Sequence, residues 1–240
     1  MLLAVKEGEF VNLDYTGKVN GKIFDLTDEK LAKENGVYED NKKYGPVTIV
    51  VGAGHLIKGV DEALVGKESD AKFEIEVEPE KGFGKKDPKL LKIMPEKIFK
   101  DQQVRPVPGM NVNIDGILGR IVSCSGGRAV VDFNHPLAGK VLEYDIKINR
   151  KIDEADEQLK GLVDIYSGMN SKDYTVEILD KKGKVSLNAG NKLSDNVKKF
   201  IIEDSKKYMG LEGVEFVESG SGKATEAASE AESRAKQNDL

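Results

Sequence analysis

Apolar and polar residues alternate along residues 8–26, on both sides of the dipeptide Asn20-Gly21. Such alternation is typical of strands with one buried face, and an Asn-Gly pair tolerates the positive φ of a tight hairpin turn. We therefore expect a β-hairpin here. In residues 27–45, Thr27 is of a type that caps helices, so we expect a short helix followed by a surface loop.

Two strand-like segments come next, with a helical segment between them. Residues 46–54 form an apolar run that ends in glycines, and residues 71–79 alternate again. The intervening residues 57–66 repeat apolar positions at helical spacing. The residues on that helical face are Ile57, Val60, Ala63 and Leu64.

The character of the chain changes after Pro88. Asp115-Gly116 and Gly126-Gly127 predict turns between three strand-like runs, which are 110–114, 117–123 and 128–133. An amphipathic helix after Pro88 is disfavoured because Pro95 would cut it short. Alternation of the earlier kind returns in 134–152.

This order predicts an insertion of one domain into another. We expect a first domain made of residues 1–85 and 133–152, with a small β-rich domain, 86–132, inserted into it. Exposed loop tips tolerate insertions of this kind.

The remaining residues predict a third domain, 153–219, with the order αββαβ. Helical spacing predicts helices at 153–169 and 193–209, the second capped by Ser194, and a last strand follows at 213–219. Between the helices we expect a hairpin that turns at Lys182-Gly183. Residues 220–240 are polar, repetitive and without an aromatic residue, which predicts a flexible tail or a solvated lone helix.

The composition fits two or three globular domains. The chain has 240 residues, 39% of them hydrophobic and 33% charged, and no apolar run long enough to cross a bilayer. With one cysteine, Cys124, and no secretory signal pattern, we expect a cytoplasmic protein without disulfides and without a membrane partner. The net charge of −5 argues against nucleic acid as a partner.

Few side chains suggest bond-breaking chemistry. His55 and His135 are the only histidines and lie far apart in the sequence, and no paired-cysteine spacing or phosphate-binding loop occurs. We therefore expect no metal and no cofactor.

Four segments nevertheless form a specific combination in a fixed order. They are YTGKVNGKIFD (15–25), GPVTIVVGAGHLIKGVDEALVGKESDAKFEIEVEPEKGFG (45–84), NHPLAG (134–139) and LEYDIKI (142–148). Together they resemble the FKBP family of peptidyl-prolyl cis-trans isomerases. The resemblance covers residues 8–152 and implies an α+β fold in which an antiparallel sheet wraps around a short helix.

The other parts of the chain resemble particular branches of this family. The β-rich insert between GFG and NHPLAG resembles the insert-in-flap domain of SlyD-type members. The early helix and the C-terminal αββαβ domain resemble the long archaeal members, the latter by position more than by motif.

The resemblance implies catalysis of rotation about X-Pro bonds. This rotation breaks no bond, and its barrier of about 18–20 kcal/mol comes from lost amide resonance. A catalyst therefore needs a dry apolar pocket and a few hydrogen-bond donors rather than a nucleophile. The implied catalytic residues are Tyr15, Asp25, Ile57 (through its backbone amide) and Tyr144. The implied substrate-binding residues are Phe24, Val47, Leu56, Val60, Phe83 and Leu137.

Three of these positions depart from the family pattern. Val60 stands where some members carry a tryptophan, Phe83 matches a tyrosine, and Val47 is smaller than the usual aromatic residue. We expect a wider pocket floor and weaker macrolide binding. Asp25 is expected to organise tyrosine hydroxyls rather than to transfer protons.

The insert is rich in apolar residues, for which two interpretations remain open. They either bind unfolded chains or form the core of the insert itself. The residues are Leu90, Leu91, Ile93, Met94, Ile98, Phe99, Val104, Val107, Met110 and Val112.

The expected partners are unfolded or partly folded polypeptides that contain X-Pro bonds. The alternative function is a non-catalytic holdase chaperone that uses the same fold to bind unfolded chains. A third hypothesis is a homodimer through the C-terminal domain, because apolar residues share one face of helix 193–209; the alternative is that the hairpin of the same domain covers this face. The apolar residues are Val197, Phe200, Ile201 and Met209.

Overall fold

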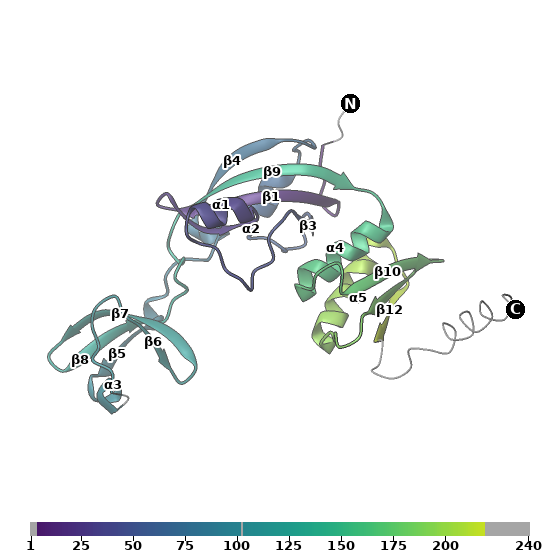
Figure 1. The fold of residues 1–240 in the computed structure, drawn as a ribbon. Helices are drawn as coiled ribbons and strands as arrows, with labels where there is room; N and C mark the ends of the chain where they lie inside the picture. Colours follow the sequence, from purple (N-terminus) through teal and green to yellow (C-terminus); the bar gives the residue numbers. More distant parts are fainter. Residues whose placement is uncertain (1–3, 102, 219–240) are drawn as a thin grey trace, which may run out of the picture.

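A computed structural model describes residues 4–101 and 103–218 of the chain. It is a mixed α+β structure with three sheets and mostly short helices (Figure 1). The predicted tail, 220–240, lies outside the described residues. No helix in the described part of the chain is long and apolar enough to cross a membrane.

The central sheet is antiparallel and brings together distant parts of the chain. Its strands are β1 (Phe10–Val19), β2 (Lys22–Leu26), β3 (Val47–Val50), β4 (Lys72–Val77) and β9 (Leu142–Ile152). Their order is β2-β1-β9-β4, and β3 pairs with β1. The predicted hairpin turn is confirmed, because Asn20 and Gly21 have φ of 50° and 71° between β1 and β2. β9 lies at the centre of this sheet and so returns the chain to it (Figure 1).

Two short helices accompany this sheet, and one predicted cap is wrong. The helices are α1 (Glu29–Glu34) and α2 (Lys58–Leu64). Asp28, rather than Thr27, caps α1 by accepting the Leu31 N–H. The Thr27 hydroxyl is buried and is used by β1 instead: it donates to Asp14 Oδ1 (2.8 Å) and accepts the Tyr15 N–H (3.1 Å).

Helix α2 packs into the inner face of the sheet, as the apolar spacing predicts. Val60 and Leu64 are buried there against alternate residues of β1 and β9. The buried sheet residues of this cluster include Val11, Leu13, Leu142, Tyr144, Ile146 and Ile148. Because side chains alternate between the faces of a strand, the residues between them point to the outer face.

Residues 91–132 form a second antiparallel sheet with its own small core. The elements are β5 (Leu91–Pro95), α3 (Lys97–Asp101), β6 (Asn111–Ile114), β7 (Ile117–Ser125) and β8 (Arg128–Asp132), and the strand order is β5-β8-β7-β6. The buried core residues are Phe99, Ile114, Ile121, Ala129 and Val131. This sheet stands apart from the central sheet at the end of two connecting segments (Figure 1).

Strand β5 is the one strand of this sheet that the sequence pattern did not predict. It pairs only with β8, so it is an edge strand, and Pro95 lies at its end. An edge position tolerates proline because the missing N–H would face solvent.

The C-terminal unit contains α4 (Ala155–Ser167), β10 (Tyr174–Leu179), β11 (Lys182–Leu187), α5 (Asp195–Met209) and β12 (Gly213–Glu218). The hairpin turns at Asp180-Lys181, both with positive φ, so the predicted turn at Lys182-Gly183 is wrong. Gly183 serves packing instead. A Cβ there would lie 2.7 Å from Leu159 Cδ2 of α4, so glycine lets the helix approach the sheet.

This unit packs directly against the central sheet. Phe10, Val50 and Ile152 of the central sheet are buried in the same apolar cluster as the C-terminal residues. Helix α4 approaches β3 so closely that a Cβ on Gly161 would lie 2.5 Å from Thr48 Cγ2.

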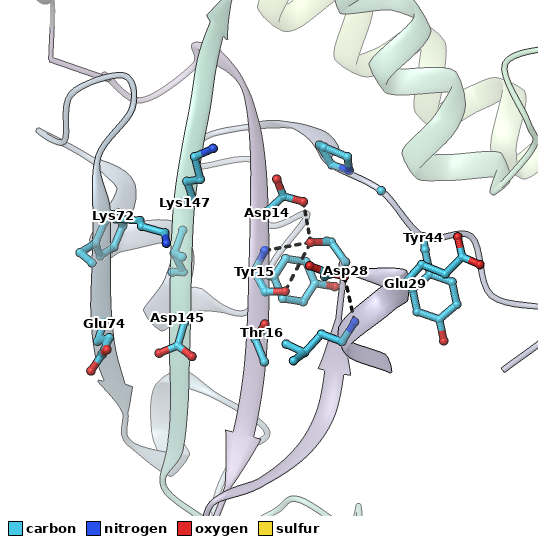
Figure 2. A pocket seen from close by; sticks show the side chains of 16 residues that line it. Asp14, Tyr15, Thr16, Asp28, Glu29, Tyr44, Lys72, Glu74, Asp145 and Lys147 are labelled. Carbon is cyan, nitrogen blue, oxygen red and sulfur yellow. Dashed lines mark hydrogen bonds between the residues drawn. The ribbon is translucent and has the colours of Figure 1, made fainter. Parts of the chain in front are cut away.

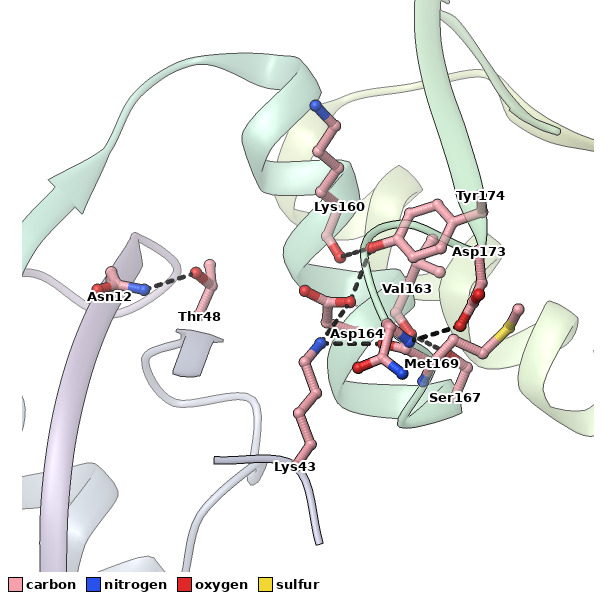
Figure 3. A network of polar contacts seen from close by, with 11 residues as sticks. Asn12, Lys43, Thr48, Lys160, Val163, Asp164, Ser167, Met169, Asp173 and Tyr174 are labelled. Atoms are coloured by element: carbon pink, nitrogen blue, oxygen red, sulfur yellow. Dashed lines mark hydrogen bonds and ion pairs between the residues drawn. The ribbon is translucent and has the colours of Figure 1, made fainter. Parts of the chain in front are cut away.

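Polar contacts join the loop before β3 to helix α4 (Figure 3). Lys43 Nζ lies 3.0 Å from Asp164 Oδ1 and donates to the Met169 carbonyl at 2.9 Å. Tyr174 donates to the same Asp164 oxygen at 2.8 Å. The contacts therefore reach from the central unit into the core of the C-terminal unit.

Candidate active site

A small cavity lies between helix α2 and the inner face of the central sheet. Its volume is about 170 Å³, and it is lined by Tyr15, Phe24, Asp25, His55, Leu56, Ile57, Val60, Phe83 and Tyr144. Eight of the ten site residues predicted from the sequence line this one cavity. They come from β1, β2, the loop before α2, α2 itself, the 82–87 loop and β9.

The structure does not bring the other two predicted residues, Val47 and Leu137, to the lining. Both are partly buried and pack against the apolar cluster behind the cavity. Val47 pairs with Leu13 at the start of β3, which directs it into the core of the sheet.

Aromatic rings form most of the wall and hold one another in place. Phe24 meets Tyr144 edge to face, with ring centroids 5.9 Å apart at 89°, and Phe83 similarly at 6.4 Å and 78°. Such T-shaped pairs are favourable beyond the area that they bury. A Cβ at Gly17 would lie 2.9 Å from both Phe24 and Tyr144. Glycine at this position of β1 therefore leaves room for the two rings to pack against the strand.

One carboxylate interrupts this apolar wall. Asp25 Oδ2 accepts a hydrogen bond from the Tyr15 hydroxyl at 2.8 Å, and Lys42 Nζ donates to the other oxygen. Burial, and then the nearby Asp25 charge, raise the pKa of both Tyr15 and Tyr144 well above the ordinary value. Both phenols therefore remain protonated donors throughout the physiological range.

The loop before α2 places backbone groups at the cavity. Asp61, buried in α2, accepts the N–H of Gly52 (2.7 Å) and of Gly54 (3.0 Å). Ile57 lies at the end of this loop, just before the helix. Within the described part of the chain, no hydrogen bond uses the Ile57 N–H, so it is free to donate to a ligand.

Three residues near the cavity were not predicted from the sequence. His55 is part of the lining, Lys42 neutralises Asp25, and His135 stacks on Phe83 with ring centroids 4.3 Å apart. The one local signal that could have predicted His55 as a cavity residue is its position next to Leu56 and Ile57. Lys42 sits in a polar loop with no pattern of its own, and only the fold brings it to the cavity. The structure described here contains no group of three His, Cys, Asp or Glu residues that could hold a metal ion.

A larger groove of about 1050 Å³ lies on the outer face of the same sheet (Figure 2). Charged side chains from neighbouring strands border it, including Lys72, Glu74, Asp145 and Lys147. Water solvates such groups better than an apolar ligand does. The smaller aromatic cavity is therefore the better site for a small apolar ring.

The described residues thus place an aromatic cavity, with a few fixed hydrogen-bond donors, against an antiparallel sheet. Comparison with known proteins identifies the class of protein. The model of the family described as FKBP-type peptidyl-prolyl cis-trans isomerase matches residues 3–100, and a model described as the FKBP26 IF domain matches residues 92–137.

Curated relatives agree with these matches. The chain is 36% identical over 158 residues to a short-type peptidyl-prolyl cis-trans isomerase of Methanocaldococcus jannaschii, a match that covers 66% of this chain and 100% of the relative. It is 30% identical to a probable FKBP-type 16 kDa isomerase of Pseudomonas fluorescens, over 49% of this chain and 81% of that protein. It is 29% identical to SlyD of Haemophilus influenzae, over 55% and 71%.

The chain therefore belongs to the FKBP-type peptidyl-prolyl cis-trans isomerase family. The resemblance drawn from the sequence is confirmed at the level of the family. The mixed α+β structure with antiparallel sheets agrees with the fold that this family implies.

Proposed function

We propose that the chain catalyses cis-trans isomerisation of X-Pro bonds in unfolded or partly folded polypeptides, and that the reaction takes place in the aromatic cavity. The observation that carries this proposal is the lining of the cavity. Aromatic and aliphatic side chains surround it, and one tyrosine–carboxylate pair and one free backbone N–H border it. These groups suit a rotation that needs no nucleophile.

The cavity acts by favouring the twisted amide over the planar one. The planar amide is more dipolar, and transfer of a polar amide into an apolar environment has a large cost in free energy. Packing of the proline ring among Phe24, Val60 and Tyr144 therefore raises the free energy of the planar amide more than that of the twisted amide. Preorganised donors at the site where charge develops add to this selective stabilisation.

Each polar group then has a defined task. The Ile57 N–H donates to the carbonyl of the residue before the proline or of the proline itself. Asp25 fixes the Tyr15 hydroxyl, and Lys42 neutralises the carboxylate so that it does not repel the substrate carbonyl. No proton is transferred in this scheme.

We further propose that the second sheet, residues 91–132, binds unfolded chains. Seven of the twelve large apolar side chains that are exposed in the described residues lie between residues 90 and 122: Leu90, Leu91, Ile93, Val107, Ile117, Leu118 and Val122. Their concentration in one small unit favours a binding role, because exposed apolar surface is typical of interaction sites. A chain held there has a raised effective concentration at the cavity.

We infer that each interpretation of the apolar residues in this unit applies to a different subset of them. Phe99 is fully buried, and the residues packed around the core include Met94, Val104, Met110 and Val112. Leu90, Leu91, Ile93 and Val107 remain exposed. The first subset stabilises the unit, and the second is available to a client.

The homodimer through the C-terminal unit stays a prediction. Of the four apolar residues on its helix, Ile201 is buried, and Val197 and Met209 pack within their own unit. Phe200 is left half exposed. Sedimentation of the full chain over a range of concentrations measures whether this surface forms a dimer.

The proposed reaction is tested by protease-coupled isomerisation of short X-Pro peptides. We expect fast catalysis by the wild type and a loss on the order of tenfold or more in Asp25→Ala, because the Tyr15 hydroxyl loses the acceptor that positions it as a donor. Asp145→Ala is the matched control. It removes a carboxylate paired with Lys18 at the outer groove, away from the cavity, and should leave the rate unchanged.

Two results would contradict this assignment. Equal losses in Asp25→Ala and Asp145→Ala would remove the case for the cavity. A wild type no faster than the uncatalysed reaction, yet able to suppress aggregation of an unfolded protein, would identify the holdase alternative.

A further inference from the structure

We propose that Tyr166 and Asp204 of the C-terminal unit are positioning residues of the isomerase site, and that they act on it through His55. This inference rests on the proposed function and adds a role for the C-terminal unit in it. Tyr166 lies on α4 and Asp204 on α5, and both reach the loop that precedes α2.

Hydrogen bonding determines which His55 nitrogen carries the proton. Nδ1 lies 3.1 Å from the backbone nitrogen of Val50. A backbone N–H can only donate, so Nδ1 must be the unprotonated acceptor. In the neutral ring the proton is therefore on Nε2, which points towards the C-terminal unit.

Two oxygen atoms of the C-terminal unit lie within hydrogen-bond distance of this Nε2–H group. Nε2 lies 3.1 Å from the Tyr166 hydroxyl oxygen and 3.2 Å from Asp204 Oδ2. Tyr166 in turn donates to Asp204 at 2.5 Å. The ring of Phe200 stacks on Tyr166 at 5.5 Å and so restricts the other side of the phenol. The imidazole is thus held at both nitrogens, and its side chain is only 4% exposed.

This contact bears on the reaction because of where His55 lies. His55 lines the cavity and directly precedes Leu56 and Ile57, whose backbone is proposed to contact the substrate. Asp61 holds the glycine part of the loop from inside the central unit. His55 holds the adjoining part through the C-terminal unit. The loop therefore has two supports, one from each unit.

The central sheet and the C-terminal unit pack tightly together close to His55, so the position of one fixes the position of the other. Val50, which donates to His55, is itself buried in the apolar cluster shared by the two units. Gly161 of α4 meets Thr48 of β3 at a distance that leaves no room for a side chain. Since reacting groups displaced by about 1 Å lose about a hundredfold in rate, even a small movement of the Ile57 amide should be measurable.

The test uses the full chain and compares Tyr166→Phe and Asp204→Ala with Tyr174→Phe. The control is matched, because Tyr174 also donates to a carboxylate of the same unit, Asp164, at 2.8 Å, without contact to His55. We expect kcat for a short X-Pro peptide to fall on the order of tenfold in the first two variants. The control should stay within about twofold of the wild type. Asp204→Asn keeps an oxygen acceptor and should recover most of the rate.

A second readout separates positioning from a loss of stability. Long-range proton–nitrogen NMR spectra report which His55 nitrogen carries the proton. We expect the Nε2-protonated form in every variant, because the Val50 N–H still donates to Nδ1. The Nε2 chemical shift should move in Asp204→Ala, which loses the carboxylate beside Nε2, and stay as in the wild type in Tyr174→Phe. The thermal unfolding midpoint of each variant identifies any rate loss that merely follows unfolding.

The outcomes distinguish this inference from the proposed function. An inactive wild type would overturn the proposed function and this inference with it. An active wild type whose Tyr166→Phe and Asp204→Ala variants match Tyr174→Phe in rate would overturn this inference alone. A loss of kcat with an unchanged unfolding midpoint and a displaced His55 Nε2 chemical shift would establish it.

Discussion

The cavity of the central sheet and the exposed side chains Ile93 and Leu118 of the second sheet are both apolar, but the two regions differ in shape. Around the cavity, Phe24, Phe83 and Tyr144 pack against one another and enclose a small volume. On the second sheet, Ile93 and Leu118 are 68% and 72% exposed. On our proposal, the first arrangement binds one small ring and excludes water from it, whereas the second presents a surface that many sequences can cover. Apolar composition alone does not distinguish the two roles.

The largest effect is expected from a change to the enclosed region. Phe24→Ala removes the ring that meets both Phe83 and Tyr144, so the cavity opens and admits water. We expect kcat/KM to fall on the order of a hundredfold for short peptides and for proline-limited protein folding alike. Stopped-flow assays on both substrates measure this. A loss confined to the protein substrate would contradict the assignment of the chemistry to the cavity.

Substitutions on the exposed apolar surface of the second sheet should affect catalysis of the protein substrate only. Ile93→Ser combined with Leu118→Ser removes apolar surface from the second sheet and leaves its core intact. We expect catalysis of proline-limited folding to fall at least about tenfold, because the client is no longer held near the cavity, while the peptide rate is unchanged.

Leu179→Ser is the control for this pair, since Leu179 is also 72% exposed but lies in the C-terminal unit. It should leave both rates unaltered. Equal losses for peptide and protein in the double variant would refute the division of roles between the two regions.

A smaller effect, on stability, is expected where the rings of Phe24 and Tyr144 pack against Gly17 of β1. Gly17→Ala places a methyl group within 2.9 Å of Phe24 and Tyr144, which should lower the free energy of unfolding by about 1–3 kcal/mol. Chemical denaturation measures this change. Gly213→Ala is the control, since no atom lies within 4 Å of its Cβ position. Similar values for the two variants would show that the rings are not tightly packed.

The smallest effect concerns pH. Burial raises the pKa of Tyr15, Tyr144, Tyr166 and Tyr174 in the folded protein above the ordinary value of 10.0. Below pH 10 these phenols are protonated in both states and do not change stability with pH. Above it the unfolded state binds fewer protons than the folded state, so the free energy of unfolding falls as pH rises.

Denaturation at several pH values, with tyrosinate absorbance as a probe, measures this dependence. Removal of one buried phenol by Tyr174→Phe should make the decline less steep. Stability that rises above pH 10 would contradict the burial of these four phenols.

The sequence predicted those parts of the molecule that local pattern controls. Alternation and turn chemistry located the hairpin at Asn20-Gly21, and helical spacing located the helix that contains Val60. Family motifs located eight of the ten predicted residues around one cavity. Strand β5 was missed because it exists only through pairing with β8, which lies some 35 residues later in the chain.

The errors and omissions share a physical cause, which is contact across long sequence separations. Gly183 was predicted to be a turn residue, but helix α4 requires a glycine there. His55 meets partners that are 111 and 149 residues away. No periodicity or spacing within a short segment reports such contacts, so the polar link between the two units could be found only in the folded structure.

One competition experiment tests the central claim, that one region isomerises and the other holds. A permanently unfolded polypeptide without proline is added to the wild type in both assays. It should occupy the second sheet and leave the cavity free. We expect it to slow catalysed protein folding in proportion to its binding and to leave the isomerisation of short X-Pro peptides unchanged. Equal inhibition of the two reactions would show that a single region does both.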